Sequence, residues 1–543
     1  MGRLRFTLTN IMFWIVIILS CLLTENIAIF SDSPRSGFED IPLYVLTFAI
    51  IGLLIFYYFL EHKKNGLTLD KILLPCFIMF GALMIWTIFR QGDRTFVDWS
   101  NEGTFSISFT FSERLLASLQ VIIWLGALYA MVFVYNRFRL NLESYRWIPK
   151  IYLILVLVFC LVDLFYEWDI IAEIFVGTYT GGGVQFLLGN PNVFGLVIFT
   201  GILSGVILSY KRFSWYYFVA MVAMFCYLIL TTSATAIYIS LIVMILYPVY
   251  EILSLIRRDR KKGFKVAIIY VCSIGLIVGL SAIFINIGVP IFANFWSFVD
   301  AGVLHKDFLT ITGRTSIWTH IIDLLKQNPL DFIFGLGHQT GSKIFQTYNS
   351  NHMAVKSAHN AVMEIFLRYG LLGAILYVGM LILVLVCLAL HIKHKRYRFA
   401  IVYGLAYLGV LAHSVAESTN IFTSNIGGTY LGLYFALPIM NILQSKKFKE
   451  IKDDVSAVPV TNEKFPRCFI LFSILYAAID VMVVKVIYNA FGIDIFSCLV
   501  IYAFLLMACL FVLSLKKKTC LGTVNSIVLR HYLKRLGVMS NEK

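Results

Sequence analysis

The sequence has few charged residues for a chain of 543. Asp, Glu, Lys and Arg make up 14% of it, whereas hydrophobic residues make up 59%. Roughly a quarter of the residues of a soluble globular protein are charged, so this composition excludes that class. The few acidic residues form no outward-facing pair suited to a cation, and the sequence therefore predicts no metal site.

The positions of the cysteines argue against a disulfide-rich protein and against a cysteine-based metal site. Nine of the ten cysteines lie inside long apolar runs, and none lies in the mostly polar stretch between residues 287 and 358. A disulfide framework or a cysteine-based metal site would need cysteines in such a polar stretch. Neither is therefore predicted.

Long apolar runs dominate what is present. A helix that crosses a bilayer needs about 20 apolar residues, and about fourteen runs approach that length. Barrel strands would be shorter and would alternate in polarity, so helices are predicted. We therefore expect an all-α, polytopic membrane protein with about 14 transmembrane helices. The runs are 8–30, 41–60, 71–90, 113–136, 149–167, 192–210, 214–231, 233–256, 264–286, 360–390, 399–415, 425–443, 466–489 and 494–515.

The distribution of Lys and Arg predicts the orientation. With a cytoplasmic N-terminus, most of the 45 basic residues fall on the cytoplasmic side, as the positive-inside rule requires. Both ends of the sequence are then cytoplasmic. No small-residue cleavage site follows the first apolar run, which we expect to be a retained anchor. The net charge of +15 reflects this topology and attraction to anionic lipid, and nucleic-acid binding is not predicted.

The helices and loops divide the chain into six parts, of which the last two helices look like an addition to a body of twelve. The parts are helices one to nine (1–286), a large extracytoplasmic loop between helices nine and ten (287–358), helices ten to twelve (359–445), a charged cytoplasmic linker (446–465), two further helices (466–515) and a cytoplasmic tail (516–543).

The large outer loop holds candidate functional residues. One helix is predicted there from Gly313 to Gln327, stopped by Asn328-Pro329. Arg314 lies in its first turn, where the helix dipole disfavours a cation, and shares a face with Trp318. A docked anion would explain that placement, and stacking on Trp318 or contact with lipid phosphate would explain it equally well. The apolar stripe of this helix consists of Ile317, Ile321, Leu324 and Leu325.

The start of the tenth helix is a second candidate. His359 lies where this helix leaves the outer surface, and a neutral imidazole there can accept a proton from a sugar hydroxyl, although a lone interfacial His often has no role. Asn360 and Glu364 are one turn apart, as are Glu364 and Arg368. Charges this deep in a membrane helix face a protein interior or a wet cavity, which favours a role for His359.

Two turns are further candidates. The stretch 334–341 places three glycines around His338, which permits backbone amides to face a ligand or makes a plain turn. Asn190-Pro191-Asn192, at the entry to the sixth helix, can present two amides to a polyol or simply cap that helix.

Taken together, these elements resemble the O-antigen ligase and polymerase superfamily of bacterial membrane glycosyltransferases. Their order and the long outer loop make the set specific, and the resemblance covers residues 1–445. The matching elements are Gly189-Asn190-Pro191-Asn192, Leu230-Thr231-Thr232-Ser233, Gly313-Arg314-Thr315-Ser316-Ile317-Trp318 with Gly335-Leu336-Gly337 after it, and His359-Asn360-Ala361-Val362-Met363-Glu364-Ile365-Phe366 running on to Gly373.

The resemblance implies an inverting glycosyl transfer on the outer face of the bacterial cytoplasmic (inner) membrane, without a metal or another cofactor. The donor in such proteins is a glycan on undecaprenyl diphosphate. His359 matches the family's general base or acceptor-positioning His, and Arg314 matches its loop Arg, which neutralises the diphosphate. The expected substrate-binding residues are Asn190, Asn192, Ser233, Trp318, His338, Asn360 and Glu364.

One position departs from the family pattern. Family members commonly carry Arg directly after the Ser of the turn between helices seven and eight, where this chain has Ala234 after Ser233. A second cation for the diphosphate would have to come from elsewhere. Arg90, Arg94 and Arg114, at the outer ends of helices three and four, are the candidates.

The variant serine turn and the added helix pair favour a polymerase of capsule, exopolysaccharide or O-antigen repeat units, with a flippase and a chain-length regulator as partners. A ligase that transfers the finished glycan to a surface acceptor is the alternative. A polysaccharide transporter or flippase is a second alternative, although such carriers usually have short loops and internal repeats. A non-catalytic scaffold is the third.

Overall fold

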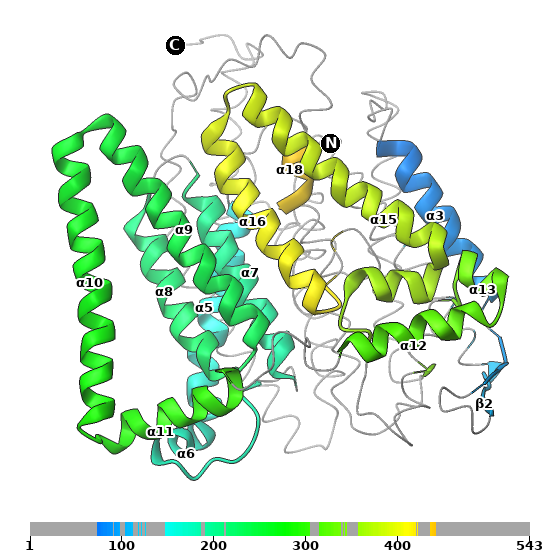
Figure 1. Ribbon diagram of the computed structural model, residues 1–543, viewed down its shortest axis with the longest axis horizontal. Coiled ribbons are helices and arrows are strands. Elements are labelled where there is room, and N and C mark those ends of the chain that lie inside the picture. Colours follow the sequence, from blue (N-terminus) through cyan, green and yellow to red (C-terminus); the bar gives the residue numbers. More distant parts are fainter. Residues whose placement is uncertain are drawn as a thin grey trace, which may run out of the picture.

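The structure is a computed structural model of the chain, and residues 73–90, 92–97, 104–111, 114, 118, 121, 125, 147–185, 190–210, 213–304, 314–337, 340, 343–344, 357–419, 421 and 435–440 are described. These residues are mostly helical (Figure 1). The predicted runs 8–30, 41–60, 466–489 and 494–515, the linker 446–465 and the tail 516–543 lie outside the described residues, as do most of the runs 113–136 and 425–443.

Each predicted run that lies within the described residues coincides with a helix. Of these helices, α7, α9, α10, α15 and α16 are long and apolar enough to cross a membrane, so the polytopic membrane class is confirmed. The helices are α3 (Leu73–Arg90), α5 (Trp147–Tyr166), α7 (Pro191–Leu208), α8 (Trp215–Leu230), α9 (Ala234–Arg258), α10 (Arg260–Asn286), α15 (Ala361–Lys393) and α16 (Tyr397–Ala416), with α18 (Leu437–Met440) inside the run 425–443.

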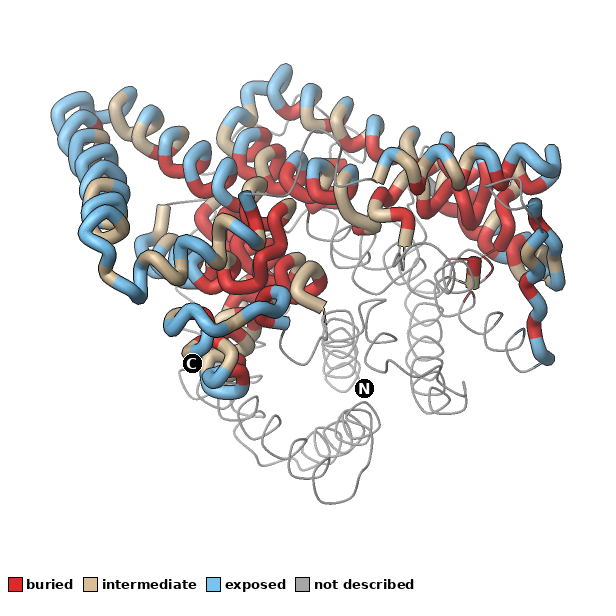
Figure 2. Tube along the Cα trace, turned by 60° about the horizontal axis from the view of Figure 1, so that its bottom comes forward, coloured by how far each residue is buried: buried red, intermediate tan, exposed pale blue. Residues whose placement is uncertain are grey.

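Helix α7 forms the centre of the packed region. Its residues from Val193 to Leu208 are all buried except Leu196, because it packs against α5, α8, α9 and α16. Small residues permit the close approach: a Cβ at Gly201 would lie 2.9 Å from Val156 on α5 and 3.0 Å from Met224 on α8. Figure 2 shows this buried region as red tube.

Helix α10 stands at the edge of this bundle. None of the side chains in its apolar window is buried (Figure 2), so it presents an apolar surface suited to lipid. It leads into α11 (Pro290–Val299) and the π-helical turn η4 (Asp300–Leu304). Helix α11 packs on α6 (Trp168–Val176), where Asn294 Nδ2 donates to Phe175 O at 3.1 Å. The sequence did not predict α6, α11 or η4.

The outer loop contains the predicted helix. Helix α12 runs from Arg314 to Lys326, and its predicted stripe is the set of residues that it buries. Asn328 caps a short following helix, α13 (Pro329–Phe334), through its side chain. Helix α15 is broken at Gly370, whose φ of 66° separates an outer segment, 361–369, from the long segment that follows. Figure 1 shows the outer segment of α15 beside α12 and α13.

The turn after α13 closes this break. Leu336 N donates to Leu367 O at 2.9 Å, and Gly337 N donates to Arg368 O at 3.1 Å. A Cβ at Gly335 would lie 2.4 Å from the Arg368 backbone, so only glycine fits there. These amides therefore satisfy carbonyl groups at the end of the outer segment of α15. Of the two predictions for this stretch, ligand binding or a plain turn, these contacts are those of a plain turn.

A small hairpin was not predicted. Strands β1 (Arg94–Val97) and β2 (Thr104–Ile107) pair antiparallel, with Arg94 opposite Ile107, and add a two-stranded sheet to the expected all-α fold. Phe96 and Ile107 are buried in the core cluster that also contains the α12 stripe. Two four-residue strands are too short to show a clear alternation in the sequence.

Hydrogen bonds from Arg398 join three helices at the end of the bundle where α16 begins. The Arg398 guanidinium donates to Glu251 Oε1 at 2.6 Å and Oε2 at 3.3 Å, and to Ser209 O at 3.3 Å. It also donates to Tyr210 O. One side chain therefore ties the start of α16 to α9 and to the end of α7.

Candidate functional site

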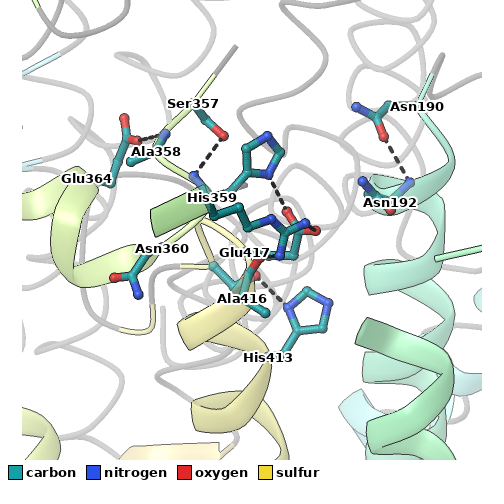
Figure 3. Close-up of polar contacts among 12 residues, drawn as sticks. Asn190, Asn192, Ser357, Ala358, His359, Asn360, Glu364, His413, Ala416 and Glu417 are labelled. Atoms are coloured by element: carbon teal, nitrogen blue, oxygen red, sulfur yellow. Dashed lines mark hydrogen bonds and ion pairs between the residues drawn. The ribbon is translucent and has the colours of Figure 1, made fainter. Parts of the chain in front are cut away.

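Three charged or titratable side chains meet where α12 and α15 begin and α16 ends. Glu417 accepts from Arg314 Nη2 through Oε1 at 2.9 Å, and its Oε2 lies 2.9 Å from His359 Nδ1. Arg314 Nη1 also donates to Ala416 O. Figure 3 shows His359 and Glu417 with a dashed line between them. The structure thus brings together Arg314 and His359, the two residues that the sequence singled out. The carboxylate of Glu417 that joins them was not singled out in the sequence.

The ends of three helices create this arrangement. Arg314 is the first residue of α12, His359 directly precedes Asn360, the N-cap of α15, and Glu417 is the C-cap of α16. His359 has a φ of 48°, a left-handed conformation that is uncommon for a residue other than glycine. Such strain persists only where the surroundings hold it, and it concentrates at functional sites.

The protonation of Glu417 determines which nitrogen of His359 is available. Burial raises the pKa of the Glu417 carboxyl, but the hydrogen bond from His359 and the nearby positive charges outweigh burial, and the net shift is downward. Glu417 is therefore ionised at neutral pH and can only accept. His359 Nδ1 must carry a proton in this hydrogen bond, so the lone pair of a neutral imidazole lies on Nε2.

Arg314 keeps donors for a ligand. A guanidinium has five N–H groups, and the contacts to Glu417 and Ala416 O use two of them. The other three have no partner among the described residues. In the structure, the anion at the start of α12 is thus the Glu417 carboxylate. The remaining N–H groups of Arg314 can donate to a second anion beside it.

Three of the predicted substrate-binding residues make hydrogen bonds to backbone groups. Trp318 Nε1 donates to Ala358 O at 2.9 Å, and Glu364 Oε2 accepts from Ala358 N at 3.0 Å. Asn360 Nδ2 donates to Val415 O at 2.9 Å. Figure 3 shows Asn360 and the contact between Glu364 and Ala358 beside His359.

Two predicted polar residues lie at the start of α7. Asn190 Oδ1 accepts from Asn192 N at 2.8 Å, so Asn190 is the N-cap of α7. Capping was the simpler of the two roles that the sequence suggested. Helix α7 contacts α16 through the stacked rings of Phe199 and His413, 5.4 Å apart. Figure 3 shows both Asn residues at the end of α7, and His413 on α16 near Glu417.

Ser233 is buried in the turn between α8 and α9. Its Oγ has no hydrogen-bond partner among the described residues, and a Cβ at Gly195 would lie 2.7 Å from it. The preceding Thr232 has a φ of 51°, which is rare for a β-branched residue. The structure therefore places Ser233 against α7 and does not bring it into contact with Arg314 or His359. His338 lies outside the described residues.

The three candidate second cations are engaged elsewhere. Arg90 and Arg94 both pair with Asp331 on α13, and Arg114 pairs with Asp93 at 2.9 Å. Helix α13 and the turn after it contact the Arg368 end of the outer segment of α15, and His359 precedes the other end, about 14 Å away at 1.5 Å per residue. None of these arginines contacts the triad of Arg314, Glu417 and His359.

The sequence reasoning missed Glu417. It placed Glu417 between the apolar runs 399–415 and 425–443 and gave it no role. A signal existed, since Glu417 directly follows an apolar helix and stands one turn after His413. Among the residues that the structure describes, no group of His, Cys, Asp and Glu is arranged to hold a metal ion.

Comparison with known proteins finds a family match over part of the chain. Residues 219–378 match the family model described as O-antigen ligase. The matched segment runs from α8 into α15 and contains Ser233, Arg314, Trp318 and His359, whereas Glu417 lies beyond it. No curated protein matches the chain. This match, which covers less than half of the chain, supports the resemblance of the chain to the O-antigen ligase and polymerase superfamily that the motifs indicate.

Proposed function

We propose that the protein polymerises undecaprenyl-diphosphate-linked oligosaccharide repeat units into a cell-surface polysaccharide, a capsule, exopolysaccharide or O-antigen, on the outer face of the bacterial cytoplasmic (inner) membrane. The observation that carries the proposal is the triad, in which a partly buried carboxylate joins a guanidinium to an imidazole where α12 and α15 begin and α16 ends. It supplies a base and an anion-binding group side by side, as transfer from a lipid diphosphate requires.

The base is His359. Because Glu417 holds the proton on Nδ1, Nε2 can take the proton of an acceptor sugar hydroxyl. The hydroxyl oxygen then forms a bond to the anomeric carbon while the bond from that carbon to the phosphate oxygen breaks. The electron pair leaves with undecaprenyl diphosphate, and attack opposite the leaving group inverts the anomeric centre. Glu417 stabilises the imidazolium that results.

Arg314 serves the leaving group. Negative charge grows on the bridging phosphate oxygen as the bond to the sugar breaks, and a fixed guanidinium near it lowers the barrier. The contacts to Ala416 O and Glu417 hold the guanidinium in place before the donor binds. The unused N–H groups then bind the diphosphate. No step needs a metal, so a chelator is expected to leave the rate unchanged.

The distribution of charge supports the outer location. Helix α16 begins beside the basic turn around Arg396 and Arg398 and ends at Glu417, and its 20 residues span about 30 Å. Helices α9 and α10 meet at another basic turn, Arg257 to Lys262, whereas the far end of α10 leads into the outer loop. Basic turns mark the cytoplasmic side, so the triad lies at the outer side.

Lipid-linked intermediates test the proposal. In a strain that lacks the gene, His359→Ala and Arg314→Ala variants are expected to insert normally and to accumulate single repeat units on undecaprenyl diphosphate. Accumulation of finished polymer on the lipid would instead identify a ligase, and retention of the repeat units on the cytoplasmic face would identify a transporter. Polymer of normal length in both variants would contradict an enzymatic role and leave a scaffold.

A further inference from the structure

The residues on both sides of His359 are held by hydrogen bonds to other helices or their side chains. Before it, Ala358 is fully buried, and its N–H and C=O groups bond to Glu364 and Trp318, which come from two helices. After it, Asn360 bonds through Nδ2 to Val415 O, two residues before Glu417. His359 therefore sits between two anchored neighbours.

The anchors are themselves fixed. Glu364 is buried, and its second oxygen, Oε1, accepts from Arg368 Nη2 at 2.5 Å. Asn360 Oδ1 accepts from Val362 N at 2.9 Å and Met363 N at 3.0 Å, which caps α15 and orients its amide toward α16. Trp318 stands on α12, one turn after Arg314. Trp318, Glu364 and Asn360 thus form a clamp around His359, which connects all three helices that carry the triad.

The conformation of His359 explains what the clamp accomplishes. Its φ of 48° is unfavourable for a side chain with a Cβ, and a free loop would relax from it. The main polar contact of the imidazole among the described residues is the one to Glu417 at 2.9 Å. A rotation about the His359 backbone would remove Nδ1 from that carboxylate and redirect Nε2.

We propose that Trp318, Glu364 and Asn360 are positioning residues, which hold His359 in its left-handed conformation with its imidazole against Glu417, and that they do not contact the sugar. The inference rests on the proposed function, because it gives these residues their purpose through His359. It reassigns three residues that the sequence had suggested as substrate contacts.

Two conservative variants isolate the clamp. Trp318→Phe keeps an aromatic ring and removes the one donor to Ala358 O. Asn360→Asp keeps the oxygen that caps α15 and removes the donor to Val415 O. Trp215→Phe is the matched control, since Trp215 is 64% exposed at the opposite end of the bundle. The substrate is the lipid-linked oligosaccharide extracted from a strain that lacks the gene.

A positioning role predicts a specific kinetic change. We expect kcat to fall about 100-fold in both variants with KM unchanged, because a small misplacement of a reacting group has an effect of that size. Melting temperature is expected to stay near that of the wild type, and Trp215→Phe is expected to keep full activity. The pairing of two different variants guards against one that fails to fold.

The outcomes separate the inference from the function beneath it. A raised KM with unchanged kcat would show that these side chains bind substrate and would overturn the inference. Unchanged kinetics in both variants, with His359→Ala inactive, would also overturn it while sparing the proposed function. A fully active His359→Ala variant would instead overturn the proposed function and the inference with it.

Discussion

Replacing Glu417 by Gln tests the chemistry of the triad with a minimal change of shape. Arg314 can only donate, so the carbonyl oxygen of the new amide must face Nη2, at the position of Oε1. The amide NH₂ then faces His359 Nδ1, at the position of Oε2. Nδ1 has to accept that hydrogen bond, which moves the imidazole proton to Nε2 and removes the base.

The size of the effect follows from the role of the base. General-base catalysis contributes about 10²- to 10⁴-fold to a rate, so Glu417→Gln is expected to lower kcat by that factor, or about 3 to 5 kcal/mol in the barrier. KM is expected to change little, because Arg314 keeps its hydrogen bond to residue 417. Glu417→Asp is the control: it keeps the charge but shortens the side chain, so it cannot reach both partners as Glu does.

The assay uses purified protein in lipid vesicles with the extracted lipid-linked oligosaccharide, and it follows chain length on a gel over time. Activity of Glu417→Gln within about threefold of the wild type would refute the assignment of the Nε2 base, since the predicted loss is at least tenfold larger. A rise in KM alone would show that Glu417 acts on donor binding through Arg314, and not on the imidazole.

Three further predictions follow from named contacts. Arg314→Lys offers one nitrogen where two contact Ala416 O and Glu417, so transfer is expected to fall at least about 100-fold while the protein still inserts, as measured in the same assay. Arg398→Ala leaves the Glu251 carboxylate buried without its partner and is expected to destabilise the protein by about 3 kcal/mol, seen as a lower melting temperature in detergent, with activity per folded molecule retained. The ionised Glu417 stabilises the fold because its pKa is lowered from the ordinary value of 4.5. The stability advantage of the wild type over Glu417→Gln is therefore expected to be full above pH 4.5 and to shrink as the pH falls through the lower pKa of the folded protein. An advantage that does not shrink would contradict this prediction.

Periodicity and hydropathy predicted the helices well. The runs that became α7, α9 and α16 were located to within about two residues, since a bilayer permits almost no other structure for such segments. The buried stripe of α12 was also predicted residue by residue, because an amphipathic helix reveals its buried face in its sequence. The kink at Gly370 was not predicted, since it depends on the packing of a distant turn against α15.

The site was half visible in the sequence. Arg314 and His359 stood out through their places at helix starts, 45 residues apart in the numbering. Glu417 did not, because an acidic residue at the end of a membrane helix is ordinary until the fold places it between a guanidinium and an imidazole. The roles of Trp318 and Asn360 were also hidden, since their partners are backbone groups of residues 358 and 415, which carry no chemical signature in a sequence.

The most direct test of the account compares wild-type protein with His359→Ala in purified form, with lipid-linked single repeat units as the only glycan. The account predicts that the wild type converts these units into longer lipid-linked chains and releases undecaprenyl diphosphate, whereas His359→Ala releases almost none. Equal chain extension and equal release of undecaprenyl diphosphate by both proteins would contradict it.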